Sequence, residues 1–229
     1  MPYIGYFQLI KHTDLFILFD DVQYIRHGWL NRNRILKPEK DWQYIIAPLQ
    51  KHNQTDLIKD IKVQKQKEWK FKIFRQIEHY KKKSPFYLQT VSILEQCFSN
   101  EEDSITKLNA NILQKICDYI EIPFNFKISS EENYNYSNVS DAGEWALRIC
   151  EQIGATTYLN PLGGKELFDT KKFNDSNIGL CFLNPGDISY SQRRNGVIET
   201  SLSIIDVLMF NSPEQIKQLL NKCEIQTGQ

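Results

Sequence analysis

The apolar run Leu-Phe-Ile-Leu-Phe at residues 15–19 is the feature that most constrains the fold, because Asp20 and Asp21 follow it directly. A run of this length with polar residues on both sides is typical of a strand that is buried on both faces. Such strands belong to sheets covered by helices, and ligands bind beyond the carboxyl ends of those strands. The run therefore predicts a buried strand with a functional site at its end.

A dense polar cluster follows this run. It contains Gln23 and the sequence Asn31-Arg32-Asn33-Arg34. In an extended chain, the two asparagines lie on one face and the two arginines on the other. Two guanidinium groups at this spacing can present paired forks to a phosphate or a carboxylate, which lysine cannot do in the same geometry. Surface salt bridges with nearby acidic residues are the alternative interpretation.

Asp20 and Asp21 are the candidate catalytic residues. Because they are adjacent, they point to opposite faces of a strand, and only one of them can face a given pocket. One carboxylate would accept a proton from, or orient, an amine or hydroxyl nucleophile, and we assign the role of base to Asp21. Gln23 can donate and accept hydrogen bonds in the same pocket. In the alternative interpretation, one aspartate caps a turn and the other is solvated.

The sequence Gly163-Gly164-Lys165 follows a predicted strand and is a second candidate for ligand contact. The backbone amides of a glycine pair can line a pocket that binds phosphate. The segment lacks the full spacing of a P-loop or of a dinucleotide-binding fingerprint. A plain tight turn is therefore at least as good an interpretation.

Charge balance and cysteine spacing exclude several classes of protein. The chain has 28 basic and 28 acidic residues and a pI near 6.9, so it has no global field for nucleic acid or an anionic membrane. Its 5 cysteines and 4 histidines show no zinc-site spacing, so we expect reduced thiols, no metal, no cofactor and no cysteine nucleophile. No apolar stretch approaches the roughly 20 residues that cross a bilayer, and no signal peptide is evident. We expect a cytoplasmic protein.

The spacing of apolar residues predicts an alternation of helices and strands. Helices are expected after Gly5, across residues 65–121, at residues 141–153 and 204–210, and from Ser212 onward. Strands are expected at residues 15–19, 42–47, 57–63, 125–128, 156–159 and 180–183. This order favours one α/β domain with a mostly parallel, Rossmann-like sheet and a helical insertion at about residues 65–121. Pro2 and Gly5 place the start of the chain in a loop, so the first strand of the sheet is expected to be missing.

The order of several short motifs resembles the WbqC-like protein family. The motifs are Gly5-Tyr6-Phe7, Asp14, Asp20-Asp21-Val22-Gln23, Trp29, Asn31-Arg32-Asn33, Tyr80 with Pro85, Ser129-Ser130, Gly154-Ala155-Thr156-Thr157-Tyr158, Gly163-Gly164, Tyr190 with Gln192, and Ser203-Ile204-Ile205-Asp206. Together they cover essentially the whole chain. Family members usually carry an amino-terminal strand that ends in a Gln-Pro-Tyr-type segment before Gly-Tyr-Phe. Met1-Pro2 begins just past that strand, so either the start was assigned internally or the strand is lost.

Members of this family are associated with gene clusters for bacterial O-antigen, the polysaccharide of lipopolysaccharide, and for related surface polysaccharides or small molecules. The resemblance implies a transferase that places an amino-acid-derived acyl group, such as glycyl, on a nucleotide-linked or carrier-linked amino sugar. An acyl donor or a carrier protein would be its second partner. The ligand-binding residues would be Gly5, Tyr6, Gln23, Asn31, Arg32, Asn33, Arg34, Ser130, Gly163, Gly164 and Gln192.

Two other classes of function remain open at this point. A nucleotidyltransferase-like enzyme would also use a strand, a glycine-containing turn and an aspartate-rich strand end, but the histidine pair that such enzymes place on phosphate is missing near Gly5. A noncatalytic subunit that binds a small ligand needs the pocket and no base.

Overall fold

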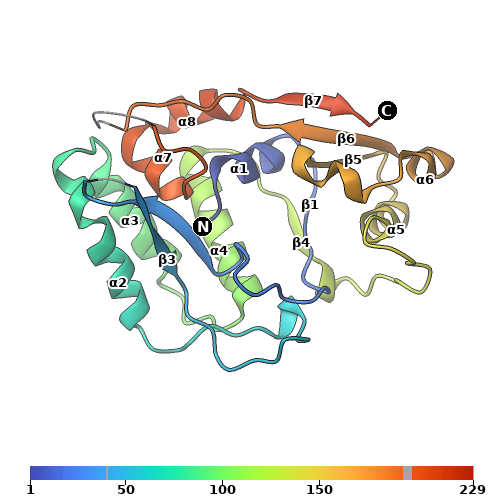
Figure 1. The fold of residues 1–229 in the computed structure, drawn as a ribbon, viewed down its shortest axis with the longest axis horizontal. Coiled ribbons are helices and arrows are strands. Elements are labelled where there is room, and N and C mark those ends of the chain that lie inside the picture. The colour runs from blue at the N-terminus through green and yellow to red at the C-terminus, as the bar shows by residue number, and fades with distance from the viewer. Residues whose placement is uncertain (40, 193–197, 229) are drawn as a thin grey trace.

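The computed structural model describes residues 1–39, 41–192 and 198–228, and it contains the predicted strand in a shorter form. Leu18 is buried as predicted, but Phe16 and Ile17 are only half-buried, because the strand belongs to a two-stranded sheet and not to a large sheet covered on both faces. The helix α1, Ile4–Lys11, leads into the strand β1, Phe16–Leu18, which pairs in parallel with β4, Phe126–Ile128. Both strands lie at the centre of the molecule in Figure 1. Because they are parallel, the polar residues that follow β1 and the 3-10 helix η3, Ser129–Glu131, meet at the same edge.

The predicted helical insertion forms a layer on one side of these strands (Figure 1). It consists of α2, Glu68–Ile77, the 3-10 helix η2, Glu78–Lys82, α3, Tyr87–Cys97, and α4, Ile105–Ile120. Trp69, Ile73 and Ile77 of α2 are buried, so the apolar stripe faces the interior as its helical spacing predicts.

A hairpin and a second sheet complete the strands. The strand β2, Arg32–Leu36, pairs antiparallel with β3, Trp42–Ile46, and Arg34 lies opposite Tyr44. The strand β5, Thr157–Pro161, pairs in parallel with β6, Gly179–Asn184, and β7, Glu224–Thr227, adds to β6 in the antiparallel direction. The architecture of the described residues is therefore mixed α/β, with helices and small parallel and antiparallel sheets.

Several local signals in the second half of the chain end or begin helices as predicted. The helix α5, Glu144–Ile153, ends at Gly154, whose left-handed φ of 68° glycine adopts without the steric cost of a Cβ. The 3-10 helix η4, Leu162–Leu167, and α6, Thr170–Asp175, follow β5. The helix α7, Ile204–Phe210, precedes α8, Pro213–Leu220, which begins with a capping box between Ser212 and Gln215.

Residues 57–63 differ from the predicted strand. Ile58–Asp60 form the 3-10 helix η1, and the amides of Ile58 and Lys59 donate to the carbonyls of Val22 and Asp20 instead of to a neighbouring strand. The alternation of apolar residues correctly predicts which side chains are buried, since Ile61 and Val63 are 0% and 2% exposed. It contains no information on the backbone hydrogen-bond partners, which lie in the loop after β1. This loop is thereby fixed against η1.

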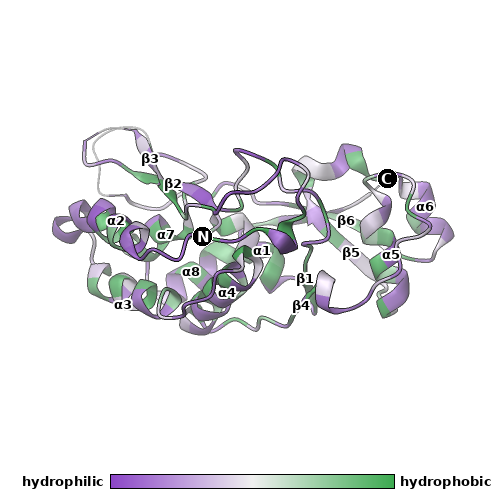
Figure 2. Cartoon of the chain, turned by 90° about the horizontal axis from the view of Figure 1, so that it is seen from below, coloured by the Kyte–Doolittle hydropathy of each residue, from purple (hydrophilic) through white to green (hydrophobic). Residues whose placement is uncertain are grey.

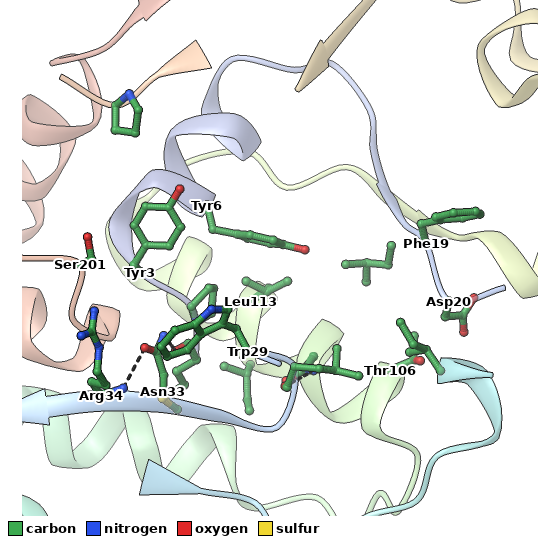
Figure 3. Close-up of a pocket in the computed structure, with 18 residues that line it drawn as sticks. Tyr3, Tyr6, Phe19, Asp20, Trp29, Asn33, Arg34, Thr106, Leu113 and Ser201 are labelled. Atoms are coloured by element: carbon green, nitrogen blue, oxygen red, sulfur yellow. Dashed lines mark hydrogen bonds between the residues drawn. The ribbon is translucent and has the colours of Figure 1, made fainter. Parts of the chain in front are cut away.

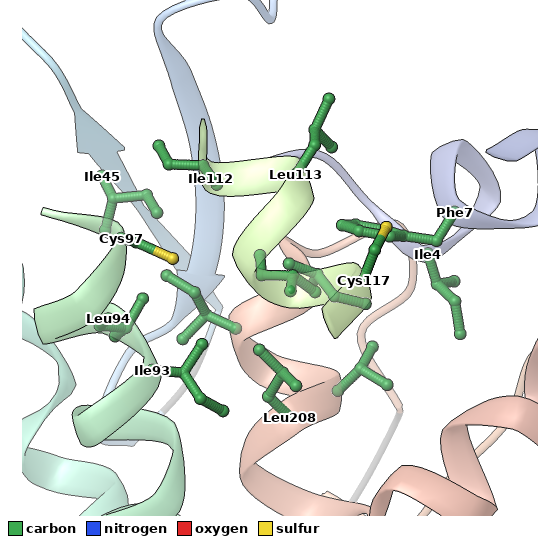
Figure 4. Close-up of a cluster of buried hydrophobic side chains, with 14 of the residues drawn as sticks. Ile4, Phe7, Ile45, Ile93, Leu94, Cys97, Ile112, Leu113, Cys117 and Leu208 are labelled. Atoms are coloured by element: carbon green, nitrogen blue, oxygen red, sulfur yellow. The ribbon is translucent and has the colours of Figure 1, made fainter. Parts of the chain in front are cut away.

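The apolar residues form two clusters. The larger cluster packs α1, α4 and α7 against the hairpin and includes Phe7, Ile45, Leu113, Cys117 and Leu208 (Figure 4). The smaller cluster lies between α5, α6 and the sheet of β5 and β6. Figure 2 shows hydrophobic and hydrophilic residues on the same helices, as expected for helices with one buried face. No helix among the described residues is both long and apolar enough to span a membrane.

Candidate functional site

A cavity of about 660 Å³ opens at the carboxyl end of β1, between the start of α1, the strand β2 and the helix α4 (Figure 3). Much of its wall is apolar, with contributions from Leu18, Phe19, Leu30, Ile58, Ile112 and Leu113. The polar side chains on the wall are those of Asp20, Asn33, Arg34, Thr106, Asn109 and Ser201, together with the tyrosines at positions 3 and 6. An apolar hollow with a few polar groups is typical of sites for small ligands, which occupy roughly 300–1,000 Å³.

Asp20 forms the acidic part of the wall. Its side chain is buried and 3% exposed. One carboxylate oxygen accepts hydrogen bonds from the Ser129 hydroxyl and the Ser130 amide, and the other accepts one from the Ser130 hydroxyl, each at 3.0 Å. These bonds, which come from the end of β4, fix the orientation of the carboxylate. Among the described residues, no cation is paired with it, so it can receive a positively charged or hydrogen-bond-donating group of a ligand.

Arg34 forms the basic part of the wall. Its guanidinium carbon lies 5.4 Å from the centre of the Trp29 ring and 5.0 Å from that of Trp42. Stacking on aromatic faces holds a guanidinium group in place and leaves its N–H donors available for an anion. The backbone amide of Arg34 donates to Asn33 Oδ1 at 2.8 Å, and Asn33 Nδ2 donates to the Met1 carbonyl at 2.8 Å. The Asn33 side chain therefore joins β2 to the segment before α1.

The acidic and basic groups lie at opposite ends of the cavity. Figure 3 places Arg34 at one end and Asp20 at the other, with Trp29, Leu113, Tyr6 and Thr106 labelled between or beside them. A cavity with this arrangement is electrostatically asymmetric. It matches a ligand that carries an anionic group and an amine, separated by a less polar part.

Two polar atoms on the wall lack the hydrogen bonds that burial normally demands. Thr106 Oγ1 and Arg34 Nε are buried and have no hydrogen-bond partner within the described part of the chain. An unsatisfied buried polar group costs about 1–3 kcal/mol. Both residues line the cavity, so a bound ligand is a natural source of the missing partners.

Tyr3 and Tyr6 shape the side of the cavity next to α1. Burial raises the pKa of Tyr6 to about 12, so its hydroxyl is protonated at neutral pH and can donate a hydrogen bond. Gly5 is needed for close packing here, because a Cβ at this position would lie 2.4 Å from Tyr3 Cε2. Gly5 does not itself line the cavity, and its small size lets the Tyr3 ring do so.

Four of the other predicted site residues hold the loops around the cavity. Asp21 pairs with Lys59 at 3.1 Å and accepts a hydrogen bond from the Tyr136 hydroxyl at 3.2 Å. Gln23 is exposed and donates to the Gln54 carbonyl at 2.7 Å. The Asn31 side chain accepts from the Tyr24 hydroxyl and donates to the Ala47 carbonyl, both at 3.0 Å.

Arg32 is the fourth. It donates to the carbonyls of His27 and Gly28, and its guanidinium carbon lies 4.6 Å from the centre of the Tyr44 ring. These hydrogen bonds stabilise the turn just before Trp29. None of these four residues is part of the cavity wall.

Of the remaining predicted site residues, one supports a residue of the cavity wall and the others lie away from the cavity. Ser130 contacts the site through its hydrogen bonds to Asp20. Gly163 and Gly164 lie in η4 and do not line the cavity. Gln192 donates to Asp206 at 3.1 Å and to the Glu199 carbonyl at 2.8 Å, in a buried cluster away from the wall. Within the described residues, no group of histidine, cysteine, aspartate and glutamate side chains could hold a metal ion.

Sequence reasoning did not identify the contribution of α4 to the site. Thr106, Asn109 and Leu113 are three and four residues apart, so they lie along one face of this helix beside the apolar stripe. Polar residues at the border of an apolar stripe were the sequence signal that could have identified this wall of the cavity. Trp29 was also not predicted as a site residue, although the nearby Asn33 and Arg34 were predicted to bind the ligand.

The fold is mixed α/β, and the cavity, with groups of opposite charge at its two ends, is a candidate site for a small ligand. The profile of the WbqC-like protein family matches residues 1–218, so the chain belongs to that family. The chain is also similar to the uncharacterized protein Rv1507c of Mycobacterium tuberculosis, with 27% identity over 226 residues, 97% of this chain and 94% of the relative. No solved structure matches the chain significantly.

Proposed function

We propose that the protein is a cytoplasmic transferase that attaches an amino-acid-derived acyl group to the amine of an amino sugar during synthesis of a bacterial surface polysaccharide. The sugar would be linked to a nucleotide or a carrier. The cavity, with Asp20 and Arg34 at its two ends, is the observation that carries the proposal. Membership of the WbqC-like family and the parallel pairs β1–β4 and β5–β6 support a Rossmann-like enzyme of this kind.

Asp20 is the residue best placed to act on the amine. The amine nitrogen attacks the carbonyl carbon of an activated donor R–CO–X, so that the C–N bond forms and the C–X bond breaks. The Asp20 carboxylate accepts the proton that the nitrogen loses and returns it to X, which leaves as HX, so the carboxylate is regenerated. The hydrogen bonds from Ser129 and Ser130 keep the carboxylate oriented during this step.

Asp21 was the predicted base, and it differs from Asp20 in its surroundings. Its carboxylate is occupied by Lys59 and Tyr136 and lies off the cavity wall. We therefore assign the base to Asp20 and a structural role to Asp21. The anionic part of the substrate would bind Arg34.

The experiment combines the purified protein with nucleotide-linked amino sugars and a glycyl thioester, and follows amide formation by mass spectrometry. Asp20→Asn should lower turnover by roughly 10²–10⁴-fold while ligands still raise the melting temperature. Asp21→Asn is the matched control, since it changes the adjacent carboxylate, and it should retain most of the turnover.

Two results would contradict this assignment. If Asp21→Asn abolishes turnover while Asp20→Asn retains it, the base is Asp21. If ligands stabilise the protein and no product forms with any donor in the panel, the protein is a binding subunit and the transferase proposal fails.

A further inference from the structure

We propose that the cavity binds a nucleoside diphosphate sugar that bends at its diphosphate, with the diphosphate at Arg34, the nucleobase on the exposed Trp29 ring beside it and the sugar directed toward Thr106 and Asp20. The assignment of an amine to the sugar rests on the proposed function. The positions of the diphosphate and the nucleobase rest on the geometry of the described residues alone.

Arg34 is prepared for an anion. Its guanidinium group is stacked against two indole rings, and its buried Nε has no hydrogen-bond partner among the described residues. No carboxylate of the described chain forms an ion pair with it. Arginine offers several N–H donors in a fixed plane, and these match the adjacent oxygens of a diphosphate better than the ammonium group of a lysine does.

Trp29 offers a flat surface next to this anion site. Its ring lies within cation–π distance of both Arg34 and Arg32, and 57% of the residue is exposed. The turn before Trp29 is held by the Arg32 hydrogen bonds to His27 and Gly28, which fixes the position of the exposed ring. A fixed aromatic face beside a guanidinium group is the arrangement on which nucleobases stack.

The middle of the cavity suits a hydroxyl-bearing ring. Thr106 Oγ1 is buried without a partner, and the Thr106 residue is 6% exposed. Asn109 also lines the cavity, and its Nδ2 donates to the Leu30 carbonyl at 3.1 Å. Apolar side chains of α4 lie beside these groups. A sugar has both the hydroxyls and the apolar C–H faces that such a surface recognises.

Isothermal titration calorimetry with UDP, dTDP, GDP and ADP, each without a sugar, tests whether the cavity binds a nucleoside diphosphate. At least one of them should bind with a dissociation constant below 1 mM, and Arg34→Gln should weaken it at least tenfold. Arg75→Gln removes an exposed arginine from α2 and should leave the affinity within twofold. If Arg34→Gln does not fold, Arg34→Lys replaces it, and the loss of the planar fork should weaken binding at least threefold.

Trp29 is tested with the same nucleotide. Because its side chain is largely exposed, Trp29→Ala should fold normally and weaken binding at least fivefold, and Trp29→Phe should recover most of the affinity. The proposal is overturned if none of the four diphosphates binds at 1 mM, or if the Arg34 variants bind as tightly as the wild type. Unchanged affinity in Trp29→Ala overturns the nucleobase assignment.

The outcome separates this inference from the proposed function. Arg34-dependent binding of a nucleoside diphosphate without any amide product retains the inference and removes the acyl transfer. Acyl transfer to a carrier-linked sugar by a protein that binds no nucleoside diphosphate removes the inference and retains the enzyme.

Discussion

At the scale of single residues, Asp206 shows how a buried charge is accommodated in this fold. The residue is 0% exposed. One carboxylate oxygen accepts a hydrogen bond from the Tyr80 hydroxyl at 2.6 Å, and the other accepts from Tyr190 at 2.6 Å and from Gln192 at 3.1 Å. Burial, followed by the nearby carboxylate, raises the pKa of Tyr80 and of Tyr190 well above the usual range. Both tyrosines therefore remain donors over the physiological pH range.

Replacement of this carboxylate should destabilise the protein. In Asp206→Asn, an NH₂ group replaces one acceptor oxygen and faces hydroxyl or amide donors, so we expect a loss of about 1–3 kcal/mol in the free energy of unfolding. Urea denaturation measures this loss. Asp118→Asn is the control, because the Asp118 side chain is exposed and, within the described residues, accepts a side-chain hydrogen bond from Gln114 alone, so its effect should stay within about 0.5 kcal/mol. Equal stability of both variants would refute this account.

The local part of this cluster could be predicted from the sequence. A serine with an acidic residue three positions later, as in Ser203 and Asp206, is a local signal for the start of a helix, and the Ser203 side chain accepts from the Ile205 amide as the N-cap of α7. The partners of Asp206 could not be predicted. Tyr80 is 126 positions away in the chain, and no periodicity within α7 encodes a contact over that separation.

At the scale of elements, Lys172 of α6 joins its helix to the start of α5. Its Nζ lies 2.6 Å from both Asp141 Oδ2 and Glu144 Oε1. The hydrogen bond from Lys172, followed by those from Ser140, lowers the pKa of Glu144 to about 2. Asp141 also accepts from the amides of Gly143 and Glu144, so this ion pair stabilises the turn from which α5 starts at Glu144, three residues after the predicted start.

Because the pKa of Glu144 is lower in the folded state, this contribution is present above about pH 4.5 and is lost as the pH falls toward 2. Lys172→Gln should therefore lower the melting temperature most at pH 7, and the difference from the wild type should shrink between pH 5 and pH 3. Lys171→Gln is the matched control, since its pair with Asp175 is exposed on both sides and should change little. A difference that is constant with pH would exclude the mechanism.

The elements that bury an apolar stripe were predictable, and those that depend on distant backbone partners were not. The helices α2, α3 and α4 lie within the predicted insertion, and β4, β5 and β6 overlap their predicted strands. The strand β7 was missed because its residues are exposed, so burial leaves no alternation in its sequence. Its hydrogen bonds come from β6, and only the assembled sheet reveals that edge.

At the scale of the whole molecule, the candidate site joins segments that are far apart in the chain. The run at residues 15–19 predicted where the end of β1 would place Asp20, and the alternation in residues 31–34 placed both arginines on one face of β2. Sequence reasoning did not bring α4 to the opposite wall, since that position follows from packing in the larger apolar cluster. The assignment of these residues to a ligand stays a prediction for the binding and turnover measurements above.

The burial of three cysteine thiols should make the stability of the whole protein fall at alkaline pH. Desolvation raises the pKa of Cys97 and of Cys117 to about 12 and that of Cys150 to about 11, from an ordinary value of 9.0. Between pH 9 and pH 11 the unfolded chain releases these protons and the folded chain retains them. The unfolded state therefore binds fewer protons, and stability falls as the pH rises. Each thiol contributes up to about 1.4 kcal/mol per pH unit.

Urea denaturation under reducing conditions at pH 8, 9, 10 and 10.5 should show this decline in the free energy of unfolding. Cys97→Ala removes one of the buried thiols, so its curve should start lower and fall less steeply above pH 9, by up to about 1.4 kcal/mol per pH unit. All five thiols are free in the structure, so no disulfide complicates the comparison. A wild-type stability that does not change from pH 8 to pH 10.5, or equal slopes for the two proteins, would show that the buried thiols do not govern the alkaline limb.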